Sequence, residues 1–186
     1  MFNKNKIAII GLGYVGLPLA KSFSRFFQIV GYDIDLNLVN RLNKKTNSDL
    51  VISNDPNVIK DSNIFIITVP TPVNSNNLPD LSFLKSATKT VGKFIKKGAV
   101  VIYESTVYPG VTEDICVPIL EKFSKLKYNN DFYCGYSPER INPGDKSKSL
   151  KNIVKITSGS NEKTANFVDE LYNKIIKAGT FKVNRI

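Results

Sequence analysis

The chain of 186 residues contains no histidine and only two cysteines. Without histidine it has no imidazole to act as a general base or a metal ligand, so we expect no metal site. Cys116 and Cys134 are too few for a disulfide framework, and their apolar neighbours predict buried, unreactive thiols. No stretch approaches the roughly 18 apolar residues of a membrane span, so we expect no membrane partner.

A signal peptide is also missing from the start of the sequence. Residues 2–6 (Phe-Asn-Lys-Asn-Lys) lead straight into a β-type apolar run, with no cleavage site of small residues. We therefore expect a cytoplasmic protein. Its length suits a single α/β domain with a well-buried core.

Acidic residues are in the minority, with 16 Asp+Glu against 26 Lys+Arg and a formal net charge of +10. The basic residues are scattered, which is typical of a solvated surface. The second interpretation of the positive charge is that it attracts anionic dinucleotides and nucleotide sugars. Nucleic-acid binding is not expected, because no pattern of aromatic and basic residues accompanies the charge.

Short apolar runs alternate with helical patterns along the chain. Nearly continuous apolar strands indicate burial on both faces, as in a parallel sheet covered by helices on both sides. The expected strands are residues 7–10, 29–32, 64–69, 100–103 and 132–136, with a weaker one at 153–157. Helical spacing is found over residues 81–95, 111–123 and 165–175. We predict one α/β domain over residues 1–186, a doubly wound, Rossmann-like parallel sheet.

A glycine-rich turn follows the first expected strand. Gly11, Gly13 and Gly16 form the pattern GxGxxG between that strand and a helix. Gly11 permits the sharp turn, Gly13 lets the backbone approach a pyrophosphate, and Gly16 lets the helix lie close to the sheet. The free N–H groups at the start of the helix then receive the phosphates. The pattern alone is weak evidence, but its place between strand and helix predicts a nucleotide site.

The second expected strand ends at Asp33, about twenty residues after the turn. A carboxylate at this place binds the adenosine ribose hydroxyls and repels a 2′-phosphate, which favours NAD over NADP. The alternative is that Asp33 only caps a helix over residues 36–42. Together, the turn and the carboxylate predict NAD as the cofactor.

Two further motifs end expected strands, where open α/β sheets bind ligands. They are VPTP at residues 69–72 and ESTVYPG at 104–110. A third motif is GYSPERINPGD at residues 135–145. With these motifs the sequence resembles the UDP-glucose/GDP-mannose dehydrogenase family over nearly its whole length. The last motif resembles the subgroup that oxidises UDP-N-acetylglucosamine or UDP-N-acetylgalactosamine to the uronic acid.

The resemblance implies roles for individual residues. Family positions that contact NAD are matched by Tyr14, Val15, Asp33, Thr71 and Thr106. Positions along the sugar nucleotide are matched by Glu139, Arg140 and Ile141. Family enzymes carry out two hydride transfers with two NAD⁺, and Thr and Glu side chains orient water. Thr106 and Glu139 are therefore the expected catalytic residues of this chain.

Purely structural roles are the alternative for these polar residues. Thr71 and Thr106 would satisfy backbone groups at the strand ends. Glu139 and Arg140 would form a surface ion pair worth under about 1 kcal/mol.

Other parts implied by the resemblance lie beyond Ile186. Family members continue into a connecting helix and a second domain, which carry a catalytic lysine, an asparagine and a nucleophilic cysteine. We therefore expect the chain alone not to oxidise a UDP-N-acetylhexosamine. We also expect exposed apolar surface near Tyr108, Tyr136 and Ile141, where the second domain would dock. Through this surface we expect a homo-oligomer or another association of the chain. The competing hypothesis is a non-catalytic nucleotide-binding or regulatory fragment.

The resemblance shows further departures from the family. Leu38 stands at a position where many members carry a basic residue near the adenosine end. The segment between Arg41 and Phe65 is shorter here than in most family members, so we expect residues to be missing there.

Overall fold

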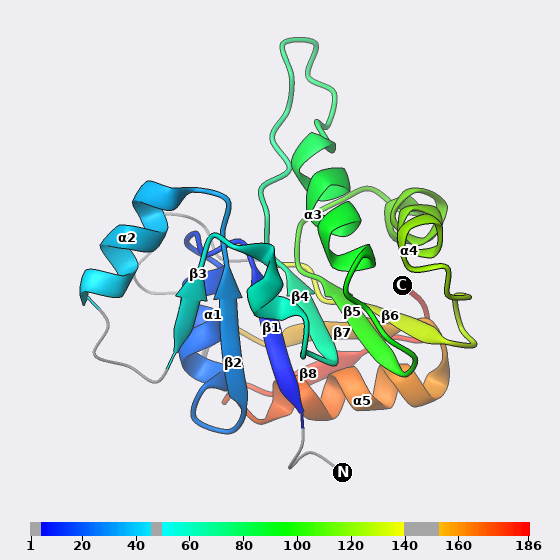
Figure 1. The fold of residues 1–186 in the computed structure, drawn as a ribbon. Helices are drawn as coiled ribbons and strands as arrows, with labels where there is room; N and C mark the ends of the chain where they lie inside the picture. Colours follow the sequence, from blue (N-terminus) through cyan, green and yellow to red (C-terminus); the bar gives the residue numbers. More distant parts are fainter. Residues whose placement is uncertain (1–4, 46–49, 140–152) are drawn as a thin grey trace.

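Strands and helices alternate along the chain in the computed structural model, which describes residues 5–45, 50–139 and 153–186 (Figure 1). The strands are β1 Lys6–Ile10, β2 Gln28–Tyr32, β3 Val51–Ser53, β4 Ile64–Ile67, β5 Ala99–Tyr103, β6 Phe132–Tyr136, β7 Lys155–Gly159 and β8 Thr180–Lys182. The helices are α1 Gly16–Phe23, α2 Leu36–Lys45, the 3₁₀-helix η1 Pro56–Ile59, α3 Ser82–Gly92, the π-helix η2 Val111–Cys116, α4 Val117–Ser124 and α5 Glu162–Asn173. Over these described ranges, no helix combines the length and the apolar character needed to cross a membrane.

The described strands form one eight-stranded sheet in the order β3-β2-β1-β4-β5-β6-β7-β8. From β1 the chain first builds outward through β2 and β3, then returns to β1's other side and continues through β4, β5 and β6. This reversal between β1 and β4 is the topological switch point at which open α/β sheets bind ligands. The predicted doubly wound α/β fold is confirmed.

Helices cover both faces of the sheet. Successive residues of each strand point to opposite faces, so each strand contributes side chains to two cores. On one face Ile7 and Ile9 join a core with Leu19 of α1 and Leu171 of α5. On the other face the neighbouring strand residues join a second core with residues of α3 and α4. Figure 1 shows α5 on one side of the sheet and α3 and α4 on the other. Burial on both faces explains why the central strands are apolar throughout.

The sheet differs from the prediction in strand direction, because β7 and β8 run opposite to the other six strands. β7 runs antiparallel to β6, with Gly135 opposite Gly159, so the sheet is mixed and not wholly parallel. Apolar content reports burial and carries no information about strand direction, so the sequence pattern could not reveal this pairing. The predicted strand at residues 153–157 lies two residues later, and the one at 64–69 ends at Ile67.

Further elements were not predicted in their observed form, among them the 3₁₀-helix η1. Strands β3 and β8 contain three residues each, too few for a period of two to be recognised. The helical pattern at residues 111–123 is a π-helix followed by α4. Pro118 lies in the first turn of α4, where it has no N–H to donate to the preceding turn.

Candidate active-site cleft

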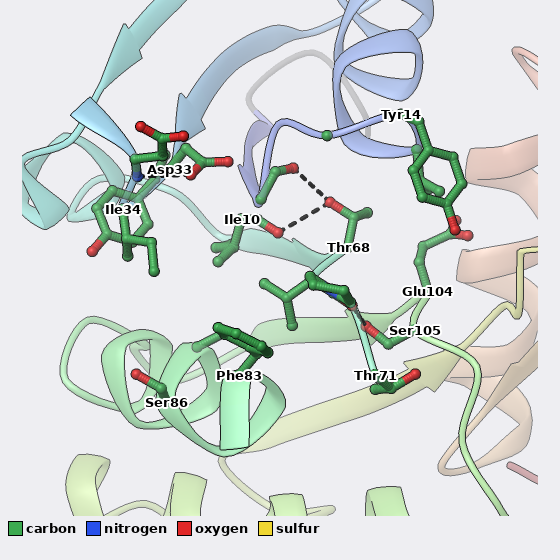
Figure 2. A pocket seen from close by; sticks show the side chains of 18 of the residues that line it. Ile10, Tyr14, Asp33, Ile34, Thr68, Thr71, Phe83, Ser86, Glu104 and Ser105 are labelled. Atoms are coloured by element: carbon green, nitrogen blue, oxygen red, sulfur yellow. Dashed lines mark hydrogen bonds between the residues drawn. The ribbon is translucent and has the colours of Figure 1, made fainter. Parts of the chain in front are cut away.

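A cleft of about 760 Å³ opens at the carboxyl ends of β1, β2, β4 and β5. Figure 2 shows Asp33 and Ile34 on one side of it and Thr71, Glu104 and Ser105 on the other. The lining residues are Ile10, Gly11, Gly13, Tyr14, Val15, Tyr32, Asp33, Ile34, Asp35, Leu38, Thr68, Val69, Pro70, Thr71, Pro72, Phe83, Ser86, Ala87, Thr90, Glu104, Ser105, Thr106 and Glu139. Every predicted site residue in the described ranges except Gly16 therefore lines one cleft.

The glycine-rich turn lies between β1 and α1 and opens onto the cleft. Gly11 has φ +91°, a left-handed conformation that residues with a side chain rarely adopt. Its N–H donates to the carbonyl of Tyr32 at 2.8 Å. The Thr68 hydroxyl at the end of β4 donates to the carbonyls of Gly11 at 2.7 Å and Ile10 at 3.0 Å. The turn is thus bound to both neighbouring strands.

The other two glycines of the turn meet opposite surroundings. A Cβ on Gly16 would lie 1.9 Å from the carbonyl oxygen of Gly11 and 2.5 Å from Oγ1 of Thr68. A Cβ on Gly13 would meet no atom within 4 Å. Gly16 is therefore needed for close packing within the protein, as predicted, whereas Gly13 leaves open space in the cleft. This space is where the sequence predicts the pyrophosphate, and the bare backbone around it fits a dinucleotide.

Asp33 follows β2 and accepts a main-chain hydrogen bond from the turn. Its Oδ2 accepts from the N–H of Leu12 at 2.6 Å, and its Oδ1 accepts from the N–H of Asp35 at 2.9 Å. The helix-cap alternative is wrong for Asp33, because Asp35 caps α2 instead. Oδ1 of Asp35 accepts from the N–H groups of Asn37 at 2.9 Å and Leu38 at 3.1 Å. The carboxylate of Asp33 lies at the cleft wall, and its binding of ribose hydroxyls stays a prediction.

Apolar side chains that the motifs did not indicate flank the Asp33 end. Ile34 is 70% exposed and Phe83 is 44% exposed, and both line the cleft with Leu38 and Ala87. Figure 2 shows Phe83 on α3 across the cleft from Ile34. The exposure of Phe83 could have been predicted from the sequence. Phe83 directly precedes the buried Leu84 in α3, so it lies off the apolar face of that helix.

Hydrogen bonds tie together the loops that follow β4 and β5. The Thr71 hydroxyl donates to the carbonyl of Thr106 at 2.7 Å, and the Ser105 hydroxyl donates to the carbonyl of Val69 at 2.6 Å. The structural alternative for Thr71 therefore holds in this structure, although the residue also lines the cleft. Thr106 is exposed at the cleft wall.

A buried cluster of charged groups forms part of this wall, and the sequence did not reveal it. Nζ of Lys155 on β7 lies 2.5 Å from Oε2 of Glu104, at the end of β5. The same Nζ lies 3.2 Å from Oε2 of Glu139, in the loop after β6. The Tyr172 hydroxyl on α5 donates to the other carboxylate oxygen of Glu104. No motif links these residues, which meet only because β5, β6 and β7 are neighbours.

Burial changes the acid–base properties of this cluster. Glu104 is 1% exposed, and desolvation raises the pKa of its carboxyl although Lys155 acts in the opposite direction. Desolvation, together with the nearby Glu104 charge, raises the pKa of the Tyr172 phenol well above 10.0. Tyr172 is therefore a hydrogen-bond donor at neutral pH.

Other predicted residues either fall outside the described ranges or do not line the cleft. Arg140 and Ile141 fall outside the described residues, so the predicted ion pair between Glu139 and Arg140 is not described either.

Cys116 and Cys134 are fully buried, and desolvation raises the pKa of both thiols. Of the expected apolar surface residues, Tyr108 is 49% exposed, while Tyr136 is half-buried.

The strand order and this cleft define a doubly wound dinucleotide-binding domain. The sequence model of the "UDP-glucose/GDP-mannose dehydrogenase family, NAD binding domain" matches residues 44–176. The chain belongs to this family, and the predicted cofactor, NAD, is confirmed.

Individual relatives share this similarity over nearly the whole chain. The chain is 48% identical over 194 residues to a UDP-N-acetyl-D-glucosamine 6-dehydrogenase of Pseudomonas aeruginosa, covering 97% of this chain and 46% of the relative. It is 51% identical over 194 residues to the enzyme of the same description from Salmonella typhi, with the same coverage. A solved structure of a UDP-D-ManNAc dehydrogenase from Pyrococcus horikoshii superposes with a TM-score of 0.88 at 36% identity, covering 97% of this chain and 47% of that one.

The chain spans about half the length of the curated relatives it matches. The alignments run over 194 residues although the chain has 186, so these relatives contain residues that this chain lacks. This agrees with a shorter segment than in the family, without placing it between Arg41 and Phe65.

Proposed function

We propose that this chain is the NAD-binding part of a dehydrogenase that oxidises C6 of a UDP-N-acetylhexosamine to the uronic acid. The observation that carries the proposal is the single cleft that joins the glycine-rich turn to the ends of β5 and β6. The relatives named for UDP-N-acetyl-D-glucosamine 6-dehydrogenation support the choice of substrate class. A cytoplasmic location is part of this proposal.

The Asp33 end of the cleft binds the adenosine half of the cofactor in this proposal. The N–H groups around Gly13 and the start of α1 receive the pyrophosphate, and Tyr14 and Val15 border it. Asp33 accepts hydrogen bonds from the ribose hydroxyls, and its negative charge repels a 2′-phosphate. Ile34 and Phe83 provide apolar surface beside it.

The opposite end, beyond Thr71, is the proposed reaction end. Bound NAD⁺ supplies the hydride acceptor for both oxidation steps. Thr106, which is exposed at the wall, is proposed to hydrogen-bond a polar group of the substrate, and the Glu139 carboxylate is proposed to accept from a hydroxyl or water; both residues line the cleft. Arg140 and Ile141 are proposed to extend this contact along the sugar nucleotide.

The proposal also assigns catalysis to groups that residues 1–186 do not supply. The lysine, asparagine and cysteine that the family resemblance implies lie beyond Ile186. Loss of one oxyanion donor costs about 10²–10³ in rate, and loss of the nucleophile removes the covalent step. We therefore propose that residues 1–186 bind the cofactor but do not oxidise the UDP-sugar on their own. We also propose that the chain associates, with a second copy or with the second domain, through the surface near Tyr108.

The test measures NADH formation with UDP-N-acetylglucosamine and UDP-N-acetylgalactosamine. Residues 1–186 alone should form no NADH, and fusion to the second domain of a family relative should produce two NADH per sugar. A Thr106→Val variant of the fusion should lower turnover. Two NADH per sugar from residues 1–186 alone would refute the assignment of catalysis to later residues. A fusion that binds NAD⁺ but stays inactive with both sugars would favour the non-catalytic hypothesis.

A further inference from the structure

The charged cluster at the cleft wall is built from distant parts of the chain. The side chains of Lys155 and Glu104 are 5% and 0% exposed, and that of Glu139 is 10% exposed. Lys155 and Glu104 are 51 residues apart in the sequence. Neither the sequence motifs nor the proposed function assigns a role to Lys155.

All three ammonium donors of Lys155 have acceptors at the wall of the cleft. Nζ donates to Oε2 of Glu104 at 2.5 Å, to Oε2 of Glu139 at 3.2 Å and to the carbonyl of Pro138 at 3.2 Å. A lysine has three such donors, so its hydrogen-bonding capacity is fully used here. Two of the three acceptors belong to the Pro138–Glu139 segment, which borders the cleft.

The cluster also attaches this segment to β5 and α5. The Glu139 N–H donates to the carbonyl of Glu104 at 3.2 Å. The second carboxylate oxygen of Glu104 accepts from the Tyr172 hydroxyl. Lys155 and Tyr172 therefore both hold the Glu104 carboxylate in place. Because Lys155 also binds Glu139, the position of the Glu139 carboxylate depends on that of Glu104.

Stability alone does not account for such an arrangement. Burying two carboxylates and an ammonium carries a desolvation cost that their attraction often only offsets, so apolar side chains of similar volume would stabilise the fold equally well. What the charged groups add is direction, because three hydrogen bonds define where the Glu139 carboxylate and the Pro138 carbonyl lie. Defined placement of polar groups is what a reaction site requires.

We propose that Lys155 is a positioning residue, which fixes the Glu139 carboxylate and the Pro138 carbonyl at the reaction end of the cleft, with Glu104 and Tyr172 as its support. This inference deepens the proposed function and rests on it for the identity of the ligand. Loss of Lys155 should loosen the Pro138–Glu139 segment. It should leave the cofactor end unchanged, because the glycine-rich turn and Asp33 are held by hydrogen bonds of β1, β2 and β4.

The experiment follows the amide of Glu139 by hydrogen exchange in NMR spectra, and NAD⁺ affinity by calorimetry, in residues 1–186. Lys155→Met keeps an unbranched side chain and removes the charge and the donors. It should speed exchange at Glu139 by at least about tenfold, while NAD⁺ affinity stays within about twofold. Lys155→Arg keeps charge and donors and should restore slow exchange. The matched control is Lys97→Met, which breaks the exposed pair with Asp131 at 3.3 Å and should leave both readouts unchanged.

Each outcome has a defined meaning. Unchanged Glu139 exchange in Lys155→Met overturns the positioning role, and equally fast exchange in Lys155→Met and Lys155→Arg replaces it with a packing role. If Lys155→Met does not fold, Tyr172→Phe decides: faster Glu139 exchange supports the proposal and unchanged exchange overturns it. Failure of the wild-type chain to bind NAD⁺ refutes the proposed function instead, and the Glu139 exchange still decides the role of Lys155.

Discussion

The two ends of the cleft are held by different kinds of interaction. At the cofactor end the main chain dominates: the Gly11 N–H binds the carbonyl of Tyr32, and the Leu12 N–H binds Asp33. At the reaction end, side chains from β5, β7 and α5 meet around the ammonium of Lys155. The first end depends on where glycines stand in a short motif, and the second depends on which strands the fold makes neighbours.

This difference predicts how each end responds to substitution. A change at the cofactor end acts through space, because a side chain added to the main chain occupies room for the ligand or for packing. A change at the reaction end acts through charge, because its groups are buried and their partners cannot be replaced by water.

The largest effect is expected for Gly13→Val. The added side chain meets no protein atom at its Cβ, so the fold should persist while the space for the pyrophosphate is filled. NAD⁺ affinity should fall by at least about 100-fold, or about 2.7 kcal/mol, in a calorimetric titration. Unchanged thermal unfolding would show that the loss belongs to binding. Retained affinity would mean that the dinucleotide does not pass over Gly13.

The next effect concerns stability and compares two glycines of the same turn. Gly16→Ala places a Cβ 1.9 Å from the carbonyl oxygen of Gly11, so the turn or α1 must shift. The free energy of unfolding, measured with urea, should fall by about 1–3 kcal/mol. Gly13→Ala is the matched control, because its Cβ enters open space. Equal stability of the two variants would contradict the close packing assigned to Gly16.

A smaller effect is expected at the reaction end in alkaline solution. Burial and the nearby Glu104 raise the pKa of Tyr172 well above its ordinary value of 10.0, so the folded chain keeps this proton where the unfolded chain loses it. The stability contribution is therefore complete below about pH 10 and decreases as the pH rises above it. A titration of tyrosinate absorbance should show a late step that coincides with unfolding and that is smaller in Tyr172→Phe. Ionisation of Tyr172 near pH 10 in the folded chain would contradict its burial.

The sequence predicted the cofactor end more fully than the reaction end, and the physical reason is locality. Gly11, Gly16 and Asp33 act through backbone conformation and strand ends, which a motif records directly. The apolar content of the strands likewise indicated burial on both faces. It carries no information about strand direction, so the antiparallel pairing of β7 with β6 was missed.

That pairing also explains why the charged cluster was missed. Lys155 reaches Glu104 only because β7 lies beside β6 and β6 beside β5. In the sequence, Lys155 is one of the scattered basic residues whose expected role was a solvated surface. Its burial at 4% exposure is a property of the fold. Thr71 shows the same limit, since its hydrogen bond to Thr106 requires the loops after β4 and β5 to meet.

A calorimetric titration of the wild-type chain with NAD⁺ and with NADP⁺ tests the central claim most directly. Because the Asp33 carboxylate lies at the cleft wall beside the glycine-rich turn, a 2′-phosphate would meet a negative charge there. The account predicts one site that binds NAD⁺ at least about tenfold more tightly than NADP⁺, a difference of about 1.4 kcal/mol. Equal affinity for the two dinucleotides would contradict the role of Asp33, and no binding of either would contradict the assignment of the cleft.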